Sequence, residues 1–212
     1  RIEKSNQWFH SIQEVLDIFL DVHQSSVLSA RYGFHEPELK AYRNWVTLQD
    51  IGNRENKTRE RIRQVEEIGK GKLKSRMAAV CLQPFYAFIE GFIDQRSKTI
   101  GTQELAGLRH HAVVRELNPA AILLLLSDLG GSRILFRNDV FSTLSLGTIE
   151  RVENHFLQNL AQSRQPISLD SLCQTLDPVQ ELTSPDMTRR ATGVVADHHC
   201  LLYTSPRPRD RG

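Results

Sequence analysis

Apolar residues recur every three or four positions at the start of the chain. In residues 8–20, WFHSIQEVLDIFL, they fall on one side of a helix, and a second short helix is predicted over residues 25–31. Gly33 follows that second helix, and glycine is the residue best suited to a left-handed C-cap. We therefore predict two helices before a polar connection that begins at His35 and runs to about Val46.

The segment that follows predicts a shorter helix, a tight turn and a longer helix. Thr47 is a suitable N-cap for a helix over residues 48–53. The predicted turn covers residues 54–57, and Thr58 then caps the longer helix by accepting from its first free N–H groups. Two capped helices in close succession are therefore expected here.

The longer helix separates its polar from its apolar side chains. At about 100° of rotation per residue, Ile62 and Val65 point away from a polar quartet. The quartet consists of Arg59, Glu60, Arg63 and Gln64. One edge of such a helix can pack into a small core while the other enters a DNA major groove, which is wide enough to admit it. The other interpretation is a solvated helix face supported by i,i+4 ion pairs.

The second half of the chain also predicts mainly helices. Residues 77–96 carry a broad apolar face of core type, in which Pro84 predicts a break or a new helix start; the face consists of Met77, Val80, Cys81, Phe85, Phe88, Ile89 and Phe92. Further helices are predicted from Thr102, over residues 119–129 before Gly130 and Gly131, and over residues 148–162, 168–176 and about 182–190. Residues 133–141, RILFRNDVF, predict a β-hairpin.

These elements predict a mainly α fold class. We expect a helix-turn-helix module followed by helical units that resemble winged helices and carry short β-hairpins. The expected domains are residues 1–76, 77–146 and a second, truncated unit over 147–199. Residues 200–212, CLLYTSPRPRDRG, resemble a translated sequencing-adaptor read-through and are set aside; a genuine Pro/Arg-rich tail is the alternative. Because the chain opens on Arg1 rather than Met, we expect a fragment.

The distribution of charge along the chain is more informative about function than the net charge. The chain of 212 residues has a formal net charge of only +2. Residues 54–76 alone contain nine basic and four acidic residues, a local net charge of +5, so the basicity is concentrated around the longer helix. A concentrated basic face is typical of proteins that bind polyanions.

Catalytic and metal-binding patterns are absent from the sequence. The three cysteines lie far apart without metal-ligand or redox spacing, as expected of free thiols in a cytoplasmic protein. His110 and His111 lack the helically spaced carboxylate of a zinc-peptidase motif, and no phosphate-binding glycine loop occurs. The strongest apolar run, residues 120–126, is too short to span a membrane. We therefore expect no enzymatic activity, cofactor, metal or membrane partner.

Residues 47–64, TLQDIGNRENKTRERIRQ, with Val65, Glu66 and Leu73 carry a resemblance to a known family. They resemble the helix-turn-helix of region four of bacterial primary sigma factors, whose usual pattern is T-L-E-E-[IV]-G-x-x-x-x-[VI]-T-R-E-R-[IV]-R-Q-[IV]-E-x-x-x-x-x-K-L. Upstream, VLSARYGF at residues 27–34 is similar to the V-L-x-L-R-Y-G-L that precedes the motif there. The resemblance covers about residues 22–76.

The resemblance implies a division of labour among the polar side chains. It implies that bases of the promoter −35 element are contacted by Arg59, Glu60, Arg63 and Gln64. Chemistry agrees, because an arginine fork can bond guanine, glutamine can bond adenine and glutamate can accept from cytosine. Phosphate contacts are expected from Lys57, Thr58, Arg61, Lys70 and Lys72, and Lys74 and Arg76 add salt-sensitive attraction.

Three positions depart from the family pattern. Glu55 stands where an aromatic residue or Leu is usual, Lys57 where Val is usual, and Lys70 where Leu is common. Gly69 and Gly71 also weaken the end of the longer helix. We therefore expect the small core of the module to be less apolar than usual and other segments to cover it.

The sequence thus predicts sequence-specific binding of double-stranded DNA, in transcription initiation or its regulation, by a bacterial or phage protein. RNA polymerase is a further expected partner. Because a long stretch of chain follows a module that ends the chain in sigma factors, we favour a protein that carries the module outside a sigma factor. One alternative is the DNA-targeting module of a larger enzyme such as a nuclease. Another is a protein that binds RNA polymerase and whose basic face is incidental.

Overall fold

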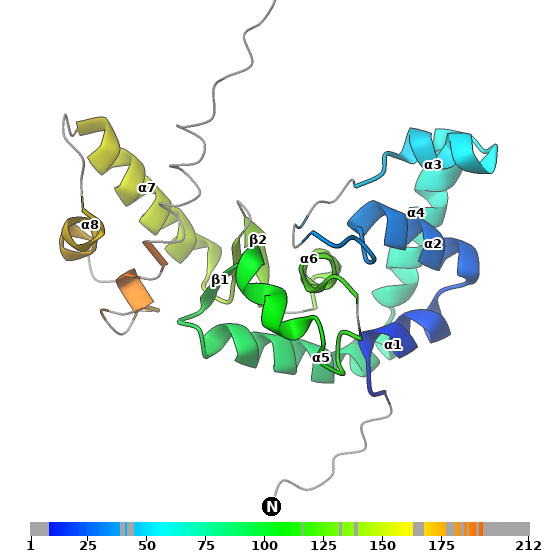
Figure 1. Cartoon of the computed structure of the whole chain (residues 1–212), viewed down its shortest axis with the longest axis horizontal. Helices are drawn as coiled ribbons and strands as arrows, with labels where there is room; N and C mark the ends of the chain where they lie inside the picture. The colour runs from blue at the N-terminus through cyan, green and yellow to red at the C-terminus, as the bar shows by residue number, and fades with distance from the viewer. Residues whose placement is uncertain are drawn as a thin grey trace, which may run out of the picture. The chain divides into compact units, whose positions relative to one another are not determined.

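A computed structural model describes residues 9–38, 41, 45–115, 117–131, 133–137, 140–162, 168–176, 181–182, 185, 187–189 and 191–192. The fold is mainly helical with a small three-stranded antiparallel sheet (Figure 1). The chain forms two compact units, the first from Arg1–Phe92 and Thr102–Ile134 and the second from Ile93–Gly101 and Leu135–Gly212. None of the described helices is long and apolar enough to cross a membrane.

This division does not coincide with the predicted boundaries at residues 76 and 146. The first unit includes most of the helix Arg76–Asp94 and also residues 102–134. The helix Pro119–Leu129 within that second range is buried and packs against the N-terminal helix Val22–Tyr32. The second unit includes residues 93–101, because a short strand there pairs with the later hairpin. Contacts between segments far apart in the sequence therefore set the division.

The first two helices are α1 (Ile12–Phe19) and α2 (Val22–Tyr32). α2 begins earlier than the sequence predicted, because Asp21 and Gln24 form a capping box around its first turn. The helix ends, as predicted, at Gly33, whose φ of 75° lies in the left-handed region.

The shorter and the longer predicted helices are α3 (Leu48–Glu55) and α4 (Arg59–Leu73). α3 runs further than predicted and ends at Asn56, whose φ of 55° is left-handed. The turn therefore lies at residues 56–58 rather than 54–57. α4 continues through both of its glycines to Leu73.

α5 (Arg76–Asp94) is one continuous helix, so the predicted break at Pro84 is wrong. Pro84 lies on the exposed side of the helix, where water can bond the carbonyl that the missing N–H leaves unpaired. The predicted apolar face is also only partly buried, since Met77 is 71% and Val80 is 68% exposed. The buried side consists of Ala78, Leu82, Phe85, Tyr86, Ile89 and Ile93.

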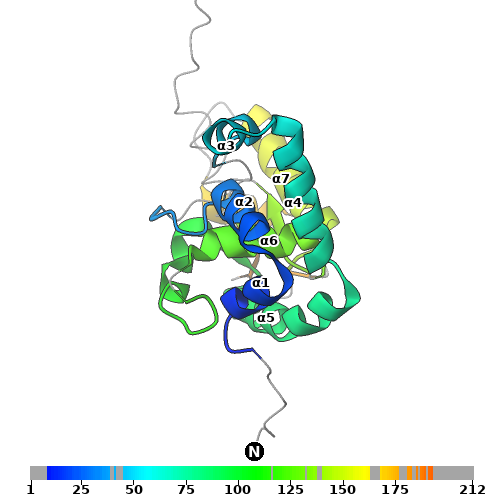
Figure 2. The same ribbon diagram turned by 90° about the vertical axis from the view of Figure 1, so that its right-hand side faces the viewer.

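α6 (Pro119–Leu129) is the central helix of the first unit and lies between α2 and α5 (Figures 1 and 2). All but two of its residues are buried, as expected for a helix that is apolar on every side. Asn118 caps it and also donates to the Glu38 carbonyl at 2.8 Å. Near its other end, the Tyr32 hydroxyl of α2 donates to Asp128 at 2.8 Å. The predicted helix and its Gly130 cap are confirmed.

The second unit contains β1 (Thr99–Gly101), β2 (Leu135–Arg137) and β3 (Val140–Ser142), in the order β1-β3-β2. The predicted hairpin is confirmed as β2 and β3, which pair antiparallel. β1 was not predicted, because a three-residue strand that ends in glycine has no visible alternation. The helix predicted at Thr102 is the 3-10 helix η1 (Thr102–Leu108) of the first unit.

Two further helices of the second unit, α7 (Leu146–Gln162) and α8 (Leu169–Thr175), agree with the prediction. A small core holds α7 against the end of the described chain; its residues are Leu144, Val152, Leu182 and Ala191. Trp8, residues 193–199 and the tail 200–212 lie outside the described residues.

Candidate nucleic-acid interface

A small apolar core joins α2, α3 and α4. Its buried residues are Val27 of α2, Ile51 of α3, and Ile62 and Val65 of α4, none more than 5% exposed. The two apolar side chains of the TRERIRQVE stretch therefore point inward, as the helical pattern predicted. Their burial fixes which edge of α4 faces solvent.

Both helices of the pair begin at a threonine cap. The Thr47 hydroxyl accepts from the Asp50 N–H at 3.1 Å, and the Thr58 hydroxyl accepts from the Arg61 N–H at 3.2 Å. These contacts confirm both predicted caps.

Gly52 lets the turn fold back closely onto α3. The Lys57 N–H donates to the Gly52 carbonyl at 2.8 Å, and a Cβ added at Gly52 would lie 2.6 Å from the Lys57 carbonyl oxygen. Any larger residue at position 52 would therefore displace the turn that precedes α4.

α2 covers the inner side of α4. A Cβ at Gly69 would lie 3.2 Å from Leu28, 3.5 Å from Gln24 and 3.6 Å from Leu20, so the glycine permits a close approach of the two helices. α1, which precedes residues 22–76, contacts both α2 and α4, in agreement with the expectation that other segments cover the module.

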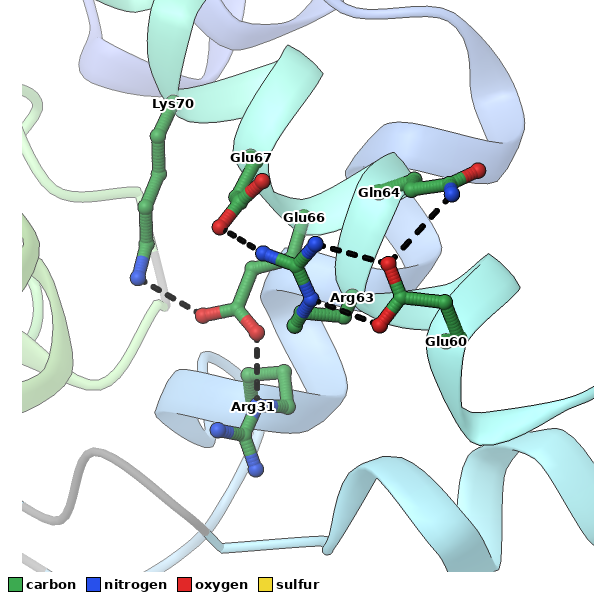
Figure 3. A network of polar contacts seen from close by, with 7 residues as sticks. All are labelled: Arg31, Glu60, Arg63, Gln64, Glu66, Glu67 and Lys70. Atoms are coloured by element: carbon green, nitrogen blue, oxygen red, sulfur yellow. Dashed lines mark hydrogen bonds and ion pairs between the residues drawn. The ribbon is translucent and has the colours of Figure 1, made fainter.

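The four side chains predicted to contact bases all lie exposed on α4. Three of them are joined to each other (Figure 3). Arg63 donates from Nε to Glu60 Oε2 at 2.8 Å and from Nη2 to Glu60 Oε1 at 2.7 Å, and Gln64 donates to the same carboxylate at 3.4 Å. The remaining nitrogen, Nη1 of Arg63, donates to Glu67. The structure therefore contains the i,i+3 and i,i+4 pairs of a solvated face on the same edge as the predicted base contacts.

These contacts keep both partners charged. The hydrogen bonds from Arg63 hold the pKa of the Glu60 carboxyl below its ordinary value, and the same carboxylate raises the pKa of Arg63. Because the side chains of Arg63 and Glu60 are 44% and 58% exposed, water screens the pair and its net stabilisation is small. A competing ligand can therefore displace the contact at low cost.

The five predicted phosphate contacts differ in how far they are engaged. The side chain of Arg61 has no hydrogen bond or ion pair with any described residue, whereas the hydroxyl of Thr58 serves as the helix cap. Lys57 lies 2.9 Å from Glu55, Lys70 lies 2.6 Å from Glu66, and Lys72 donates to Gln24 at 2.8 Å.

Exposed cationic side chains lie toward both ends of the segment 54–76. In the part of the chain that the structure describes, no hydrogen bond or ion pair is made by the exposed side chains of Arg54, Arg59, Arg61, Lys74 and Arg76. All four acidic residues of the segment 54–76, in contrast, are paired with cations. The net charge of +5 is therefore available to a polyanion.

A buried ion network lies on the inner side of α4 and was missed in the sequence. Glu66, only 7% exposed, pairs with Arg31 of α2 at 3.1 Å and with Lys70 at 2.6 Å (Figure 3). Arg31 also donates to the Val46 carbonyl, just before α3, at 2.9 Å. The available signal was the position of Glu66, which falls on the same side of the helical pattern as Ile62.

The three departures from the family pattern are all accommodated by ion pairs. Glu55 accepts from Lys57 and lies 2.6 Å from His23 of α2, while Lys70 pairs with Glu66. The hydrogen bond from Lys57 holds the pKa of Glu55 below its ordinary value. Charged contacts therefore occupy positions that are usually apolar in the pattern that the sequence resembles, as expected of a less apolar core.

No group of three or more histidine, cysteine or acidic residues that could hold a metal occurs among the described residues. His111 instead stacks on Phe88, with ring centroids 4.5 Å apart.

Comparison of this chain with protein families, with curated proteins and with solved structures found no match. The interpretation of the α4 edge therefore depends on its own geometry and charge.

Proposed function

We propose that this chain binds double-stranded DNA with sequence specificity and acts in transcription initiation or its regulation. In this proposal α3 and α4 form a helix-turn-helix, with −35-type promoter recognition of the kind found in sigma-factor region four. RNA polymerase is the partner that this role requires.

One observation supports the proposal above the others. The edge of α4 that carries Arg59, Glu60, Arg63 and Gln64 is solvent-exposed, while the opposite edge is fixed by the buried Ile62 and Val65. A helix held along one edge can place the other in a major groove without losing its own packing.

The chemistry of the exposed edge fits base readout. The Arg63 fork already bonds a planar two-oxygen acceptor, Glu60, and guanine presents O6 and N7 to an arginine in a similar two-point arrangement. Glu60, once released, can accept from the N4 amino group of cytosine. On binding, the exposed contacts between Arg63 and Glu60 are replaced by contacts to bases, and no covalent bond is made or broken.

The surrounding charge fits the phosphate backbone. Arg59 and Arg61 lie in the first turn of α4, and Lys74 and Arg76 lie just beyond its end. Cations on either side of a reading helix supply attraction that does not depend on sequence and falls with salt.

The test is selection by the full-length chain from a pool of randomised duplexes, followed by affinity measurements on the selected duplex, on a −35-type promoter duplex and on scrambled versions. We expect enrichment of a defined motif. Arg63→Ala should lose roughly 1–3 kcal/mol of discrimination at one base position, as for a bidentate contact. Arg76→Ala is the matched control, because it should weaken binding to all duplexes equally.

Failure of the wild-type chain to enrich any motif, together with equal affinity for selected and scrambled duplexes, would reject base readout. If enrichment occurs but Arg63→Ala and Arg76→Ala behave alike, the assignment of α4 as the reading helix is wrong.

A further inference from the structure

Glu67 has no assigned role, although it contacts a residue that we place at the DNA. It lies one helical turn beyond Arg63, accepts from Arg63 Nη1, and its side chain is 61% exposed (Figure 3). Glu60 pairs with the same Arg63 guanidinium. Arg63 is thus held between two carboxylates.

The two carboxylates outweigh the charge of Arg63 in its immediate surroundings. Arg63, Glu60 and Glu67 together carry a net charge of −1, and Gln64 beside them is neutral. Cationic side chains that make no hydrogen bond or ion pair within the described chain lie on either side of this group, at Arg59, Arg61, Lys74 and Arg76. The carboxylates of Glu60 and Glu67 therefore repel phosphate next to Arg63, while the cations on either side attract it.

Phosphate is a poor substitute for the two carboxylates. A phosphate oxygen that took Arg63 would leave Glu60 and Glu67 without a cation, next to a polyanion. A guanine followed by a cytosine instead offers acceptors to Arg63 and a donor to Glu60, so that only one carboxylate loses its partner. Specificity can come from such a penalty against the wrong ligand as well as from contacts to the right one.

We propose that Glu67 is a specificity-determining residue, which restrains Arg63 from binding phosphates and so lowers affinity for DNA of the wrong sequence. The effect on sequence discrimination rests on the proposed function. The restraint on Arg63 itself should weaken its binding to any polyanion.

The experiment compares Glu67→Gln with Glu36→Gln in the full chain. Both variants remove one negative charge from an exposed glutamate, but Glu36 lies in the connection after α2 and does not contact Arg63. Each is measured for binding to scrambled duplex, to the selected duplex and to heparin, a sulfated polysaccharide without bases. The same pair of variants is then measured in an Arg63→Gln background.

Glu67→Gln should bind scrambled duplex and heparin roughly 2–5-fold more tightly than Glu36→Gln does, a range typical of an exposed ion pair. The ratio of selected to scrambled affinity should fall by a similar factor. Glu67→Gln and Glu36→Gln should no longer differ in either quantity in the Arg63→Gln background, because Glu67 then has no guanidinium to pair with.

Equal gains in Glu67→Gln and Glu36→Gln would overturn the inference, since they would report general charge alone. A gain by Glu67→Gln that persists without Arg63 would overturn it as well. If no duplex is selected by the wild-type chain, the proposed function fails, but the heparin measurement still decides whether Glu67 restrains Arg63.

Discussion

Arg31 of α2 and Glu66 of α4 form an ion pair of 3.1 Å in which the side chains are only 11% and 10% exposed. The pair is buried, whereas the neighbouring contacts of Arg63 with Glu60 and Glu67 are exposed (Figure 3). Because Arg31 also bonds the Val46 carbonyl at 2.9 Å, one guanidinium ties α2 to α4 and to the segment that leads into α3. The rotation of α4 about its axis is therefore set from within the unit.

Removal of Arg31 should destabilise the first unit. Arg31→Ala leaves the Glu66 carboxylate buried with Lys70 as its remaining cation, and we expect a loss of about 3 kcal/mol in the free energy of unfolding. The measurement is urea unfolding. Arg54→Ala is the matched control, because Arg54 is exposed and has no partner in the described chain, and it should change stability by less than about 0.5 kcal/mol. Equal stability of the two variants would show that the pair contributes nothing net.

Two glycines in neighbouring helices should respond to alanine in opposite directions. Gly52→Ala puts a methyl group 2.6 Å from the Lys57 carbonyl oxygen, and we expect a loss of about 1–3 kcal/mol from overpacking. A Cβ added at Gly71, which lies within α4, would have open space around it. The higher helix propensity of alanine should therefore raise stability by about 0.5–1 kcal/mol in Gly71→Ala. Thermal unfolding of both variants checks the signs, and destabilisation by Gly71→Ala would contradict the exposed position of that residue.

The local features of this module could be predicted because each depends on neighbouring residues. Thr47 and Thr58 serve as caps, and Ile62 and Val65 are buried, since a hydroxyl before a helix and a three-residue apolar spacing carry their own physical reason.

What depends on distant residues could not be predicted. β1 exists only through its pairing with β3, and Pro84 is tolerated only because its side of α5 is exposed. The burial of Glu66 likewise requires Arg31, which lies far away in the sequence. For the candidate site, the positions on α4 and the i,i+4 pairs of a charged helix face could be predicted, whereas the contact of Glu55 with His23 of α2 could not.

The cluster of Glu55, His23 and Lys57 should make the free energy of unfolding depend on pH in the acidic range. Hydrogen bonds, first from Lys57 and then from His23, lower the pKa of Glu55 from its ordinary value of 4.5. A lowered carboxyl pKa means that the stabilisation is present above pH 4.5 and is lost as the pH falls through the lowered pKa. Because the Glu55 side chain is 25% exposed, we expect only about 0.5 kcal/mol.

The measurement is urea unfolding of Glu55→Gln and the wild-type chain between pH 7 and pH 3. The difference in unfolding free energy should shrink toward zero at the acidic end. Glu36→Gln, which changes an exposed glutamate outside this cluster, should show no such convergence. A difference that stays constant with pH would exclude the charge of Glu55 as its cause.

The salt dependence of DNA binding should separate free from engaged cations on α4. Arg61 has no side-chain partner in the described chain, so Arg61→Ala should reduce the slope of log affinity against log salt by about 0.9, the value for one phosphate contact. Lys70 is already neutralised by Glu66 at 2.6 Å, and Lys70→Ala should reduce the slope by much less while lowering stability. Affinities for one scrambled duplex at several salt concentrations give both slopes. A larger slope change for Lys70→Ala than for Arg61→Ala would mean that DNA displaces Glu66 from Lys70, and that the inner network opens when the helix binds.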